Sequence, residues 1–243
     1  MKTIKKLLIR FFFLAFIILA GIVLYLNFNT YNPMLEAINK MNMDNVSIKN
    51  SVIIFEPNED VTSNLIFYQG GLVKPESYAV LAQMLADEGV RVFIPRMPLN
   101  LAILNQRAYE GITEKGVYEE PFYIAGHSLG GATAAIALSN AETSFEGIIF
   151  LAGYGTDNSD LRNKNLKVLS ITAQNDTIFN WETYESYKEL LPDSSKFFTV
   201  AGGNHAGFGF YGEQKGDGEA EISREIQHNI TVERIVAFIK DLQ

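Results

Sequence analysis

A serine, an aspartate and a histidine in this sequence are placed so that together they could carry out nucleophilic chemistry. Ser128 lies in Gly126-His127-Ser128-Leu129-Gly130, which fits the pattern Gly-x-Ser-x-Gly. A short apolar run at 121–124 precedes it, and small residues that favour a close-packed helix follow at 131–138. A serine on a sharp turn from strand to helix is exposed to substrate, and the helix N-terminus can stabilise an oxyanion. The alternative is an ordinary turn without chemistry.

A nucleophilic serine needs a base, and histidine is suited to that role at neutral pH. The chain has three histidines. His205 lies in a glycine-rich loop, 201–207, directly after the last predicted strand, at the carboxyl edge where sites form in open α/β sheets. We expect His127 to point away from the Ser128 hydroxyl, and His228 to lie on the surface ahead of the last helix. His205 is therefore the predicted base; a loop histidine with local hydrogen bonds is the alternative.

The acid that orients the base should lie between serine and histidine in the chain. Asp176 comes shortly after the predicted strand 167–172, so we expect it at the same edge of the sheet. Asp157 and Asp160 belong to an earlier loop, and Asp193 to a surface turn. Asp176 is thus predicted to accept the histidine Nδ1–H and stabilise the imidazolium. A solvated turn is the alternative.

Two backbone N–H groups should receive the oxyanion. We predict Leu129, the residue after the serine, and Gly71, in the loop after the strand 65–68. Leu72 is the neighbouring alternative to Gly71, because sequence alone does not determine the register of this loop.

An apolar acyl or aryl group would need apolar neighbours at the site. Leu72, Phe208, Phe210 and Tyr211 are the predicted substrate contacts, since they flank the oxyanion loop and the base. The alternative for the aromatic residues is packing against the last helix. The stretch between the serine and the last helix has no insertion large enough for a separate cap domain.

Composition excludes several kinds of site. The chain has no cysteine, and it contains neither a His-Glu-x-x-His motif nor a His/carboxylate cluster at metal-ligand spacing. We therefore predict no metal and no cofactor. After residue 28 the chain carries 16 basic against 28 acidic side chains, a net charge of −12. Nucleic acid is a poor partner for so acidic a domain, so we expect a small-molecule or lipid-like substrate.

The first 28 residues differ in character from the rest. Four basic residues and no acid lie within 1–10, and residues 11–28 contain no charge. A run of this length with a basic start predicts a signal anchor whose N-terminus stays in the cytoplasm and whose following domain lies outside. A cleaved signal peptide, which would release a secreted protein, is the alternative.

The remainder reads as a linker at 29–45 and one domain at 46–243. Short apolar runs alternate with helical patterns, which predicts a mostly parallel sheet with helices on both faces. We expect helices at 99–108 and 222–242, among others, and a polar connection at 110–120.

Several of these motifs resemble those of the α/β-hydrolase superfamily, and within it the compact bacterial alpha/beta hydrolase family 5 group. The matching stretches are Tyr68–Val73, Arg96–Ala102, Ile124–Gly131, Asn175-Asp176, Gly203–Gly209, Tyr211-Gly212 and Gly216–Gly218. The sequence departs from the group at Gln69, where proline is more usual. The resemblance spans roughly residues 50–240 and implies the α/β-hydrolase fold, a Ser-His-Asp hydrolase and no cofactor.

Together these features predict a membrane-anchored serine hydrolase that cleaves carboxylic esters outside the cell through an acyl-enzyme. Acyl transfer or amide cleavage by the same three residues is an alternative within enzymes. A binding module that has lost turnover is the alternative outside them.

Overall fold

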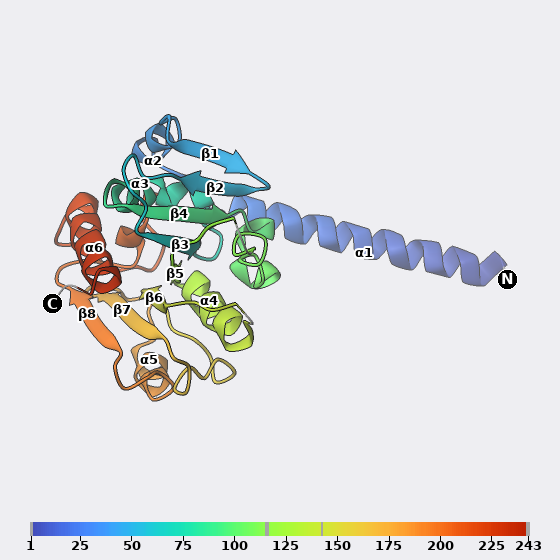
Figure 1. Cartoon of the computed structure of the whole chain (residues 1–243). Helices are drawn as coiled ribbons and strands as arrows, with labels where there is room; N and C mark the ends of the chain where they lie inside the picture. Colours follow the sequence, from blue (N-terminus) through green and yellow to red (C-terminus); the bar gives the residue numbers. More distant parts are fainter. Residues whose placement is uncertain (1, 115–116, 142, 242–243) are drawn as a thin grey trace.

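One twisted sheet of eight strands forms the centre of the molecule in the computed structural model, which describes residues 2–114, 117–141 and 143–241 (Figure 1). The spatial order is β1-β2-β4-β3-β5-β6-β7-β8. Strands β3 to β8 are parallel, and β1 and β2 add an antiparallel edge beside β4. The bounds are β1 Val46–Lys49, β2 Val52–Phe55, β3 Ser63–Tyr68, β4 Val90–Pro95, β5 Phe122–His127, β6 Gly147–Leu151, β7 Lys167–Ala173 and β8 Lys196–Val200.

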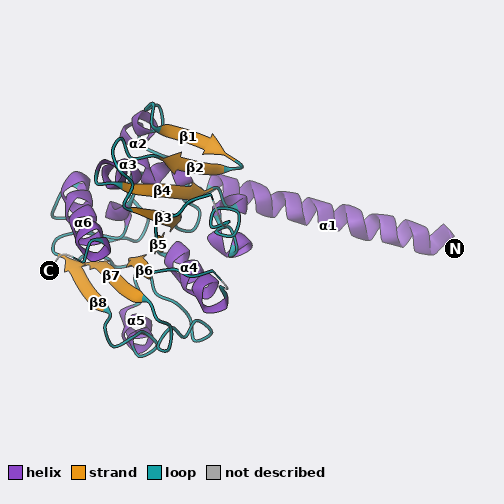
Figure 2. Ribbon diagram, viewed as in Figure 1, coloured by secondary structure: helices purple, strands orange, loops and turns teal. Residues whose placement is uncertain are grey.

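Helices cover both faces of this sheet, as predicted (Figure 2). Side chains along β3 alternate between the two faces: Leu65 and Phe67 pack with α3 and α6, whereas Ile66 and Tyr68 pack with α4. Every residue of β3 is buried, as is usual for a parallel strand between two helical layers. The helices are α1 Lys2–Phe28, α2 Leu35–Lys40, α3 Ala79–Asp87, α4 Leu129–Asn140, α5 Trp181–Lys188 and α6 Arg224–Ile239, with short 3-10 turns η1 Pro75–Tyr78, η2 Pro98–Asn100, η3 Ala102–Asn105 and η4 Ala206–Phe208.

The segment 29–45, expected as a linker, is packed against the domain. Tyr31 forms a β-bridge with Val73, and Ala37 of α2 is fully buried in the core that α3 and α6 share. Met34 and Met41 pack against the same core. These few apolar side chains are spaced among polar residues, so the composition of the segment did not reveal the packing.

Two further expectations were wrong in detail. The stretch 99–108 forms the two short turns η2 and η3, because Leu99 (φ 51°) and Asn100 (φ 56°) adopt the left-handed conformation and interrupt a helix. His228 lies inside α6 and is 1% exposed. Helix α6 begins at Arg224 behind a Ser223 cap; residue 242, the expected end of this helix, lies outside the described residues.

Burial of His228 generates a prediction about stability in acid. Burial, and secondarily Arg224, lowers the pKa of His228 from 6.5 to about 3. Between these values the unfolded chain binds a proton that the folded chain excludes, so stability falls as pH falls below 6.5. His228→Gln should remove roughly 2 kcal/mol of the stability lost between pH 7 and pH 5. Denaturant titrations of the detergent-solubilised protein, followed by the single tryptophan, Trp181, measure this. An unchanged pH dependence in the variant would contradict it.

Candidate active site

The elbow at Ser128 joins β5 to α4 through a strained turn. Ser128 has φ 51° and ψ −120°, a conformation that non-glycine residues rarely adopt and that is found at functional sites. A Cβ atom on Gly126 would overlap the Gly130 carbonyl carbon, and one on Gly130 would overlap the Tyr68 carbonyl oxygen. Both glycines are therefore needed for the strand and helix to lie this close. The half-buried Ser128 is thereby held at the N-terminus of α4.

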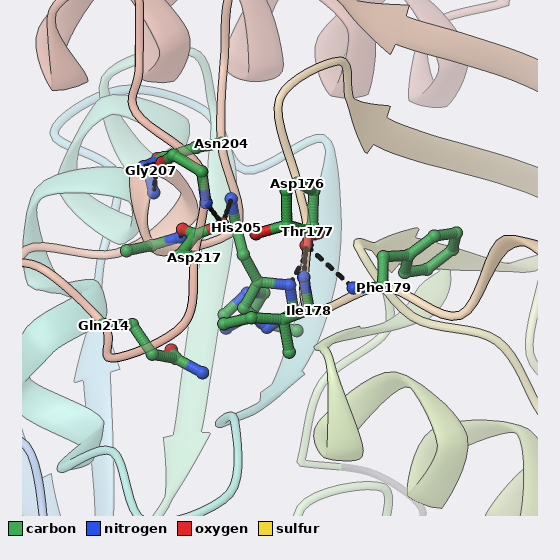
Figure 3. A network of polar contacts seen from close by, with 12 residues as sticks. Asp176, Thr177, Ile178, Phe179, Asn204, His205, Gly207, Gln214 and Asp217 are labelled. Carbon is green, nitrogen blue, oxygen red and sulfur yellow. Dashed lines mark hydrogen bonds and ion pairs between the residues drawn. The ribbon is translucent and has the colours of Figure 1, made fainter.

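His205 and Asp176 form a buried pair on the loops that follow β8 and β7 (Figure 3). His205 Nδ1 lies 2.6 Å from Asp176 Oδ2, and the two residues are 2% and 3% exposed. The second carboxylate oxygen of Asp176 accepts the backbone N–H groups of Ile178 and Phe179, both at 2.9 Å. A carboxylate held this way directs the imidazole proton to Nδ1, which leaves Nε2 free to accept a proton.

Ser128 and His205 line the same pocket. It has a volume of about 260 Å³ and is walled mainly by apolar groups, including Ala152, Tyr154 and Phe179. Leu129, Ala132 and Ile178 complete the apolar wall. The structure thus brings together the predicted serine and histidine around a space for substrate, with Asp176 behind the histidine. Within the described part of the chain, no group of three or more His, Asp or Glu side chains is arranged to hold a metal ion.

The loop after β3 lies against the first residue of α4. A Cβ on Gly71 would be 3.1 Å from the Leu129 side chain. Among the described residues, neither the Gly71 nor the Leu129 N–H has a hydrogen-bond acceptor, whereas the Leu72 N–H donates to the Asn100 carbonyl at 2.9 Å. Of the two alternatives, Gly71 therefore has the free donor and Leu72 does not. Gln69 is buried and donates through Nε2 to the Val73 carbonyl at 3.0 Å, which closes the loop on itself.

A family model described as alpha/beta hydrolase family matches residues 64–229, more than half of the chain. The chain belongs to the alpha/beta hydrolase family. No curated protein matches it in sequence.

Solved structures similar to this alpha/beta hydrolase include carboxyl esterase 2 of the fungus Tuber melanosporum, with a TM-score of 0.62 and 14% identity over 88% of this chain and 91% of that one. Est1E of Butyrivibrio proteoclasticus has a TM-score of 0.56 and 15% identity over 78% of this chain and 94% of that one. The dienelactone hydrolase of Anabaena variabilis has a TM-score of 0.57 and 14% identity over 81% of this chain and 94% of that one. At these identities the likeness concerns the fold.

The aromatic residues beside the base do not line the pocket of this hydrolase. Phe208, Phe210 and Tyr211 are 1%, 2% and 5% exposed and belong to the core. Phe210 packs edge-on against His228 of α6, with ring centroids 4.8 Å apart. The alternative of packing against the last helix is therefore the observed one. The apolar wall comes instead from Tyr154, Ile178 and Phe179, which follow β6 and β7.

Tyr78 and His127 connect the loop at Gly70 to His205, and sequence reasoning gave them no such role. The Tyr78 hydroxyl accepts the Gly70 N–H at 2.9 Å and shares a hydrogen bond of 2.9 Å with His127 Nδ1. The His127 ring lies 4.6 Å from the His205 ring, centroid to centroid. Burial, and then the neighbouring His205, lowers the pKa of His127 well below 6.5. His127 is thus neutral and does not oppose a positive charge on His205.

Asp217 holds the backbone that carries His205 (Figure 3). Its Oδ2 accepts the Ala206 N–H at 2.8 Å, and its Oδ1 accepts the Gly218 N–H at 2.8 Å and the His205 N–H at 3.3 Å. Residues of the loop 213–221 line a polar hollow of about 630 Å³, and neither Ser128 nor His205 lines it. Through Asp217, the loop 213–221 therefore supports the backbone at His205 and Ala206. The stretch Gly216–Gly218 was the one sequence signal that pointed to it.

Replacement of Tyr78 by Phe should lower both stability and turnover. The variant leaves the buried Gly70 N–H without an acceptor, at a cost of roughly 1–3 kcal/mol, and loosens the loop that carries Gly71. We expect a melting temperature lower by several degrees and a kcat lower by about ten-fold, with KM little changed. Tyr187→Phe is the matched control, since its buried hydroxyl donates to the Ser159 carbonyl away from the pocket. An equal loss of kcat in both variants would contradict the role of Tyr78.

Asp217→Asn should lower kcat by roughly ten-fold while the protein stays folded. An amide has one acceptor oxygen, so it cannot accept from both Ala206 and the 205/218 pair, and the base loses its fixed position. Steady-state kinetics on a soluble ester measure this. The control is Asp193→Asn, in an exposed turn. Full activity of Asp217→Asn would show that the base needs no such support.

Proposed function

We propose that this alpha/beta hydrolase is a serine esterase that cleaves carboxylic esters through an acyl-enzyme. The observation that carries the proposal is the strained Ser128 on an elbow whose pocket also contains His205, with Asp176 bonded to His205 Nδ1 at 2.6 Å. Strain of this kind persists only where the surrounding structure imposes it, and here it exposes a hydroxyl beside a base.

In the proposed reaction the Ser128 oxygen attacks the ester carbonyl carbon while His205 Nε2 takes the hydroxyl proton. The N–H groups of Gly71 and Leu129 donate to the carbonyl oxygen as it becomes an oxyanion. Collapse of the tetrahedral intermediate breaks the bond to the alcohol, which leaves with the proton from His205. Water then repeats the sequence on the acyl-enzyme and releases the acid and free Ser128. Asp176 orients His205 and stabilises its charged form throughout.

The size of the pocket supports a small group on one side of the ester. About 260 Å³ is at the low end for a small-molecule site, and the walls are apolar. Est1E, one of the similar structures, has been solved with ferulic acid bound, which is a small aromatic acid. Short acyl or compact aryl groups are therefore the proposed occupants.

The proposal includes attachment to a membrane. The helical segment Ile4–Phe28 contains an 18-residue stretch with a mean hydropathy of 2.8, and no residue of that stretch is buried. Basic residues lie only at its N-terminal end, which favours a cytoplasmic N-terminus and a catalytic domain outside. The mass of the mature chain distinguishes this anchor from a cleaved signal peptide.

The test of the proposed activity uses the full-length protein in detergent with a fluorophosphonate probe and p-nitrophenyl esters of graded acyl length. We expect labelling and turnover in the native protein, and loss of both in Ser128→Ala. Asp176→Asn should lower kcat by roughly three to four orders of magnitude, because the base loses its orientation. Ser186→Ala, on the exposed face of α5, is the control. A folded native protein that neither reacts with the probe nor cleaves any ester would make the domain a binding module.

A further inference from the structure

Thr30 and Tyr31 join α1 to the domain, and both residues form hydrogen bonds. On one side, Thr30 donates through its hydroxyl to the Leu26 carbonyl of the helix at 2.8 Å. On the other side, the Tyr31 N–H donates to the Leu72 carbonyl at 2.7 Å, and the Tyr31 carbonyl accepts the Lys74 N–H at 3.1 Å. The apolar helix is therefore bonded, through two adjacent residues, to the loop that carries the proposed oxyanion donor.

Chain length then places this loop at the membrane surface. The 25 residues Ile4–Phe28 extend about 37 Å as a helix, enough to cross a hydrocarbon core of about 30 Å. Tyr31 follows Phe28 by three residues, a reach of about 10 Å at most. Since the helix and this short connection leave little slack, Leu72 lies near the headgroup layer, which is about 5–8 Å deep.

Apolar side chains continue from the end of α1 toward Ser128. The turn η2 contacts α1, and η3 contacts η2 and follows it in the chain after one residue. Ile103 and Leu104 of η3 are 38% and 53% exposed. Leu101, between the two turns, lies within van der Waals reach of a Cβ on Gly71. This apolar flank, Leu101 with Ile103 and Leu104, joins the span to the proposed oxyanion loop.

The far rim of the pocket is apolar as well. Ile178 and Trp181 are 36% and 38% exposed, and Trp181 packs against Phe179 of the pocket wall. Tryptophan is favoured at membrane–water interfaces because its ring is apolar and its N–H is polar. The net charge of −12 beyond residue 28 disfavours an anionic surface.

From these contacts we infer that the enzyme takes its ester from the surface of a neutral or zwitterionic bilayer. One small side of the ester enters the 260 Å³ pocket, and the larger apolar side stays among the lipid chains along the apolar flank. The substrate class is thus an uncharged amphiphile that carries one short acyl or alcohol group in ester linkage. This inference rests on the proposed esterase activity and on α1 as a retained anchor.

The first experiment measures how close residue 104 lies to the lipid headgroups, and its result does not depend on catalysis. The chain has no cysteine, so Leu104→Cys supplies a single site for an environment-sensitive fluorophore. The full chain is reconstituted in phosphatidylcholine vesicles that contain a headgroup spin-labelled lipid. We expect quenching of a label at 104 at least about three-fold stronger than at Phe197→Cys, a similarly exposed position (45%) on the opposite edge strand β8.

The second measurement separates membrane delivery from chemistry. A 15-residue Gly/Ser spacer between Phe28 and Asn29 leaves the domain intact and lets it move about 20 Å from the span. Hexadecyl butyrate and butyl hexadecanoate in the vesicles are compared with soluble p-nitrophenyl butyrate. For whichever bilayer ester is cleaved, the spacer should lower the rate at least about five-fold, because the effective concentration falls. The rate on p-nitrophenyl butyrate should change less than two-fold.

The outcomes distinguish the two proposals. Cleavage of p-nitrophenyl butyrate without selective quenching at 104, or without an effect of the spacer on either bilayer ester, overturns the inference and leaves the esterase standing. A mature chain that lacks residues 1–28 overturns it in the same way. Failure to cleave p-nitrophenyl butyrate refutes the esterase, and the inference falls with it.

Discussion

The site depends on how closely the first turn of α4 lies to the end of β3. Only glycine fits at position 130, because the Tyr68 carbonyl oxygen occupies the space where a Cβ would be. Only glycine fits at position 126, because a Cβ there would overlap the Gly130 carbonyl carbon. This close packing fixes the left-handed conformation of Ser128 and sets the Leu129 backbone beside Gly71. A single methyl group at either glycine would push the helix off the strand. The serine conformation and the two free donors would then be lost together.

The other half of the site is held differently. His205 follows β8 on a loop with little regular structure, so its backbone is fixed by hydrogen bonds from side chains. Asp217 accepts from residues 205 and 206, and Gln227 of α6 both accepts from and donates to the backbone of Asn204. Arg224 donates to the carbonyls of Ala206, Gly209 and Gly212. These contacts leave the loop that carries His205 few alternative conformations, which suits the role proposed for His205 beside Ser128.

Periodicity and local motifs predict the elements of this molecule whose structure is determined by residues close together in the sequence. The strands, the elbow and the placement of Asp176 and His205 at one edge follow from apolar runs and from the geometry of parallel sheets. The contacts of Tyr78 and Asp217 could not be predicted in this way, because each depends on how a side chain is turned toward a nearby loop, which no periodicity specifies. The aromatic residues in the stretch 208–211 were predicted to contact substrate but belong to the core. Closeness in sequence to His205 does not determine whether a side chain points into the pocket or into the core.

The bridge between residues 31 and 73 bears on how the protein is made. The Tyr31 hydroxyl also accepts the Lys215 N–H, 184 positions later in the chain. The first stretch of the globular unit to leave the ribosome therefore packs against one of the last. Contacts so distant in sequence form late in folding. If the domain is exported behind its apolar helix, the chain as far as Lys215 must cross before Tyr31 acquires this partner. The domain thus stays unfinished, and without a working site, for as long as it is in transit.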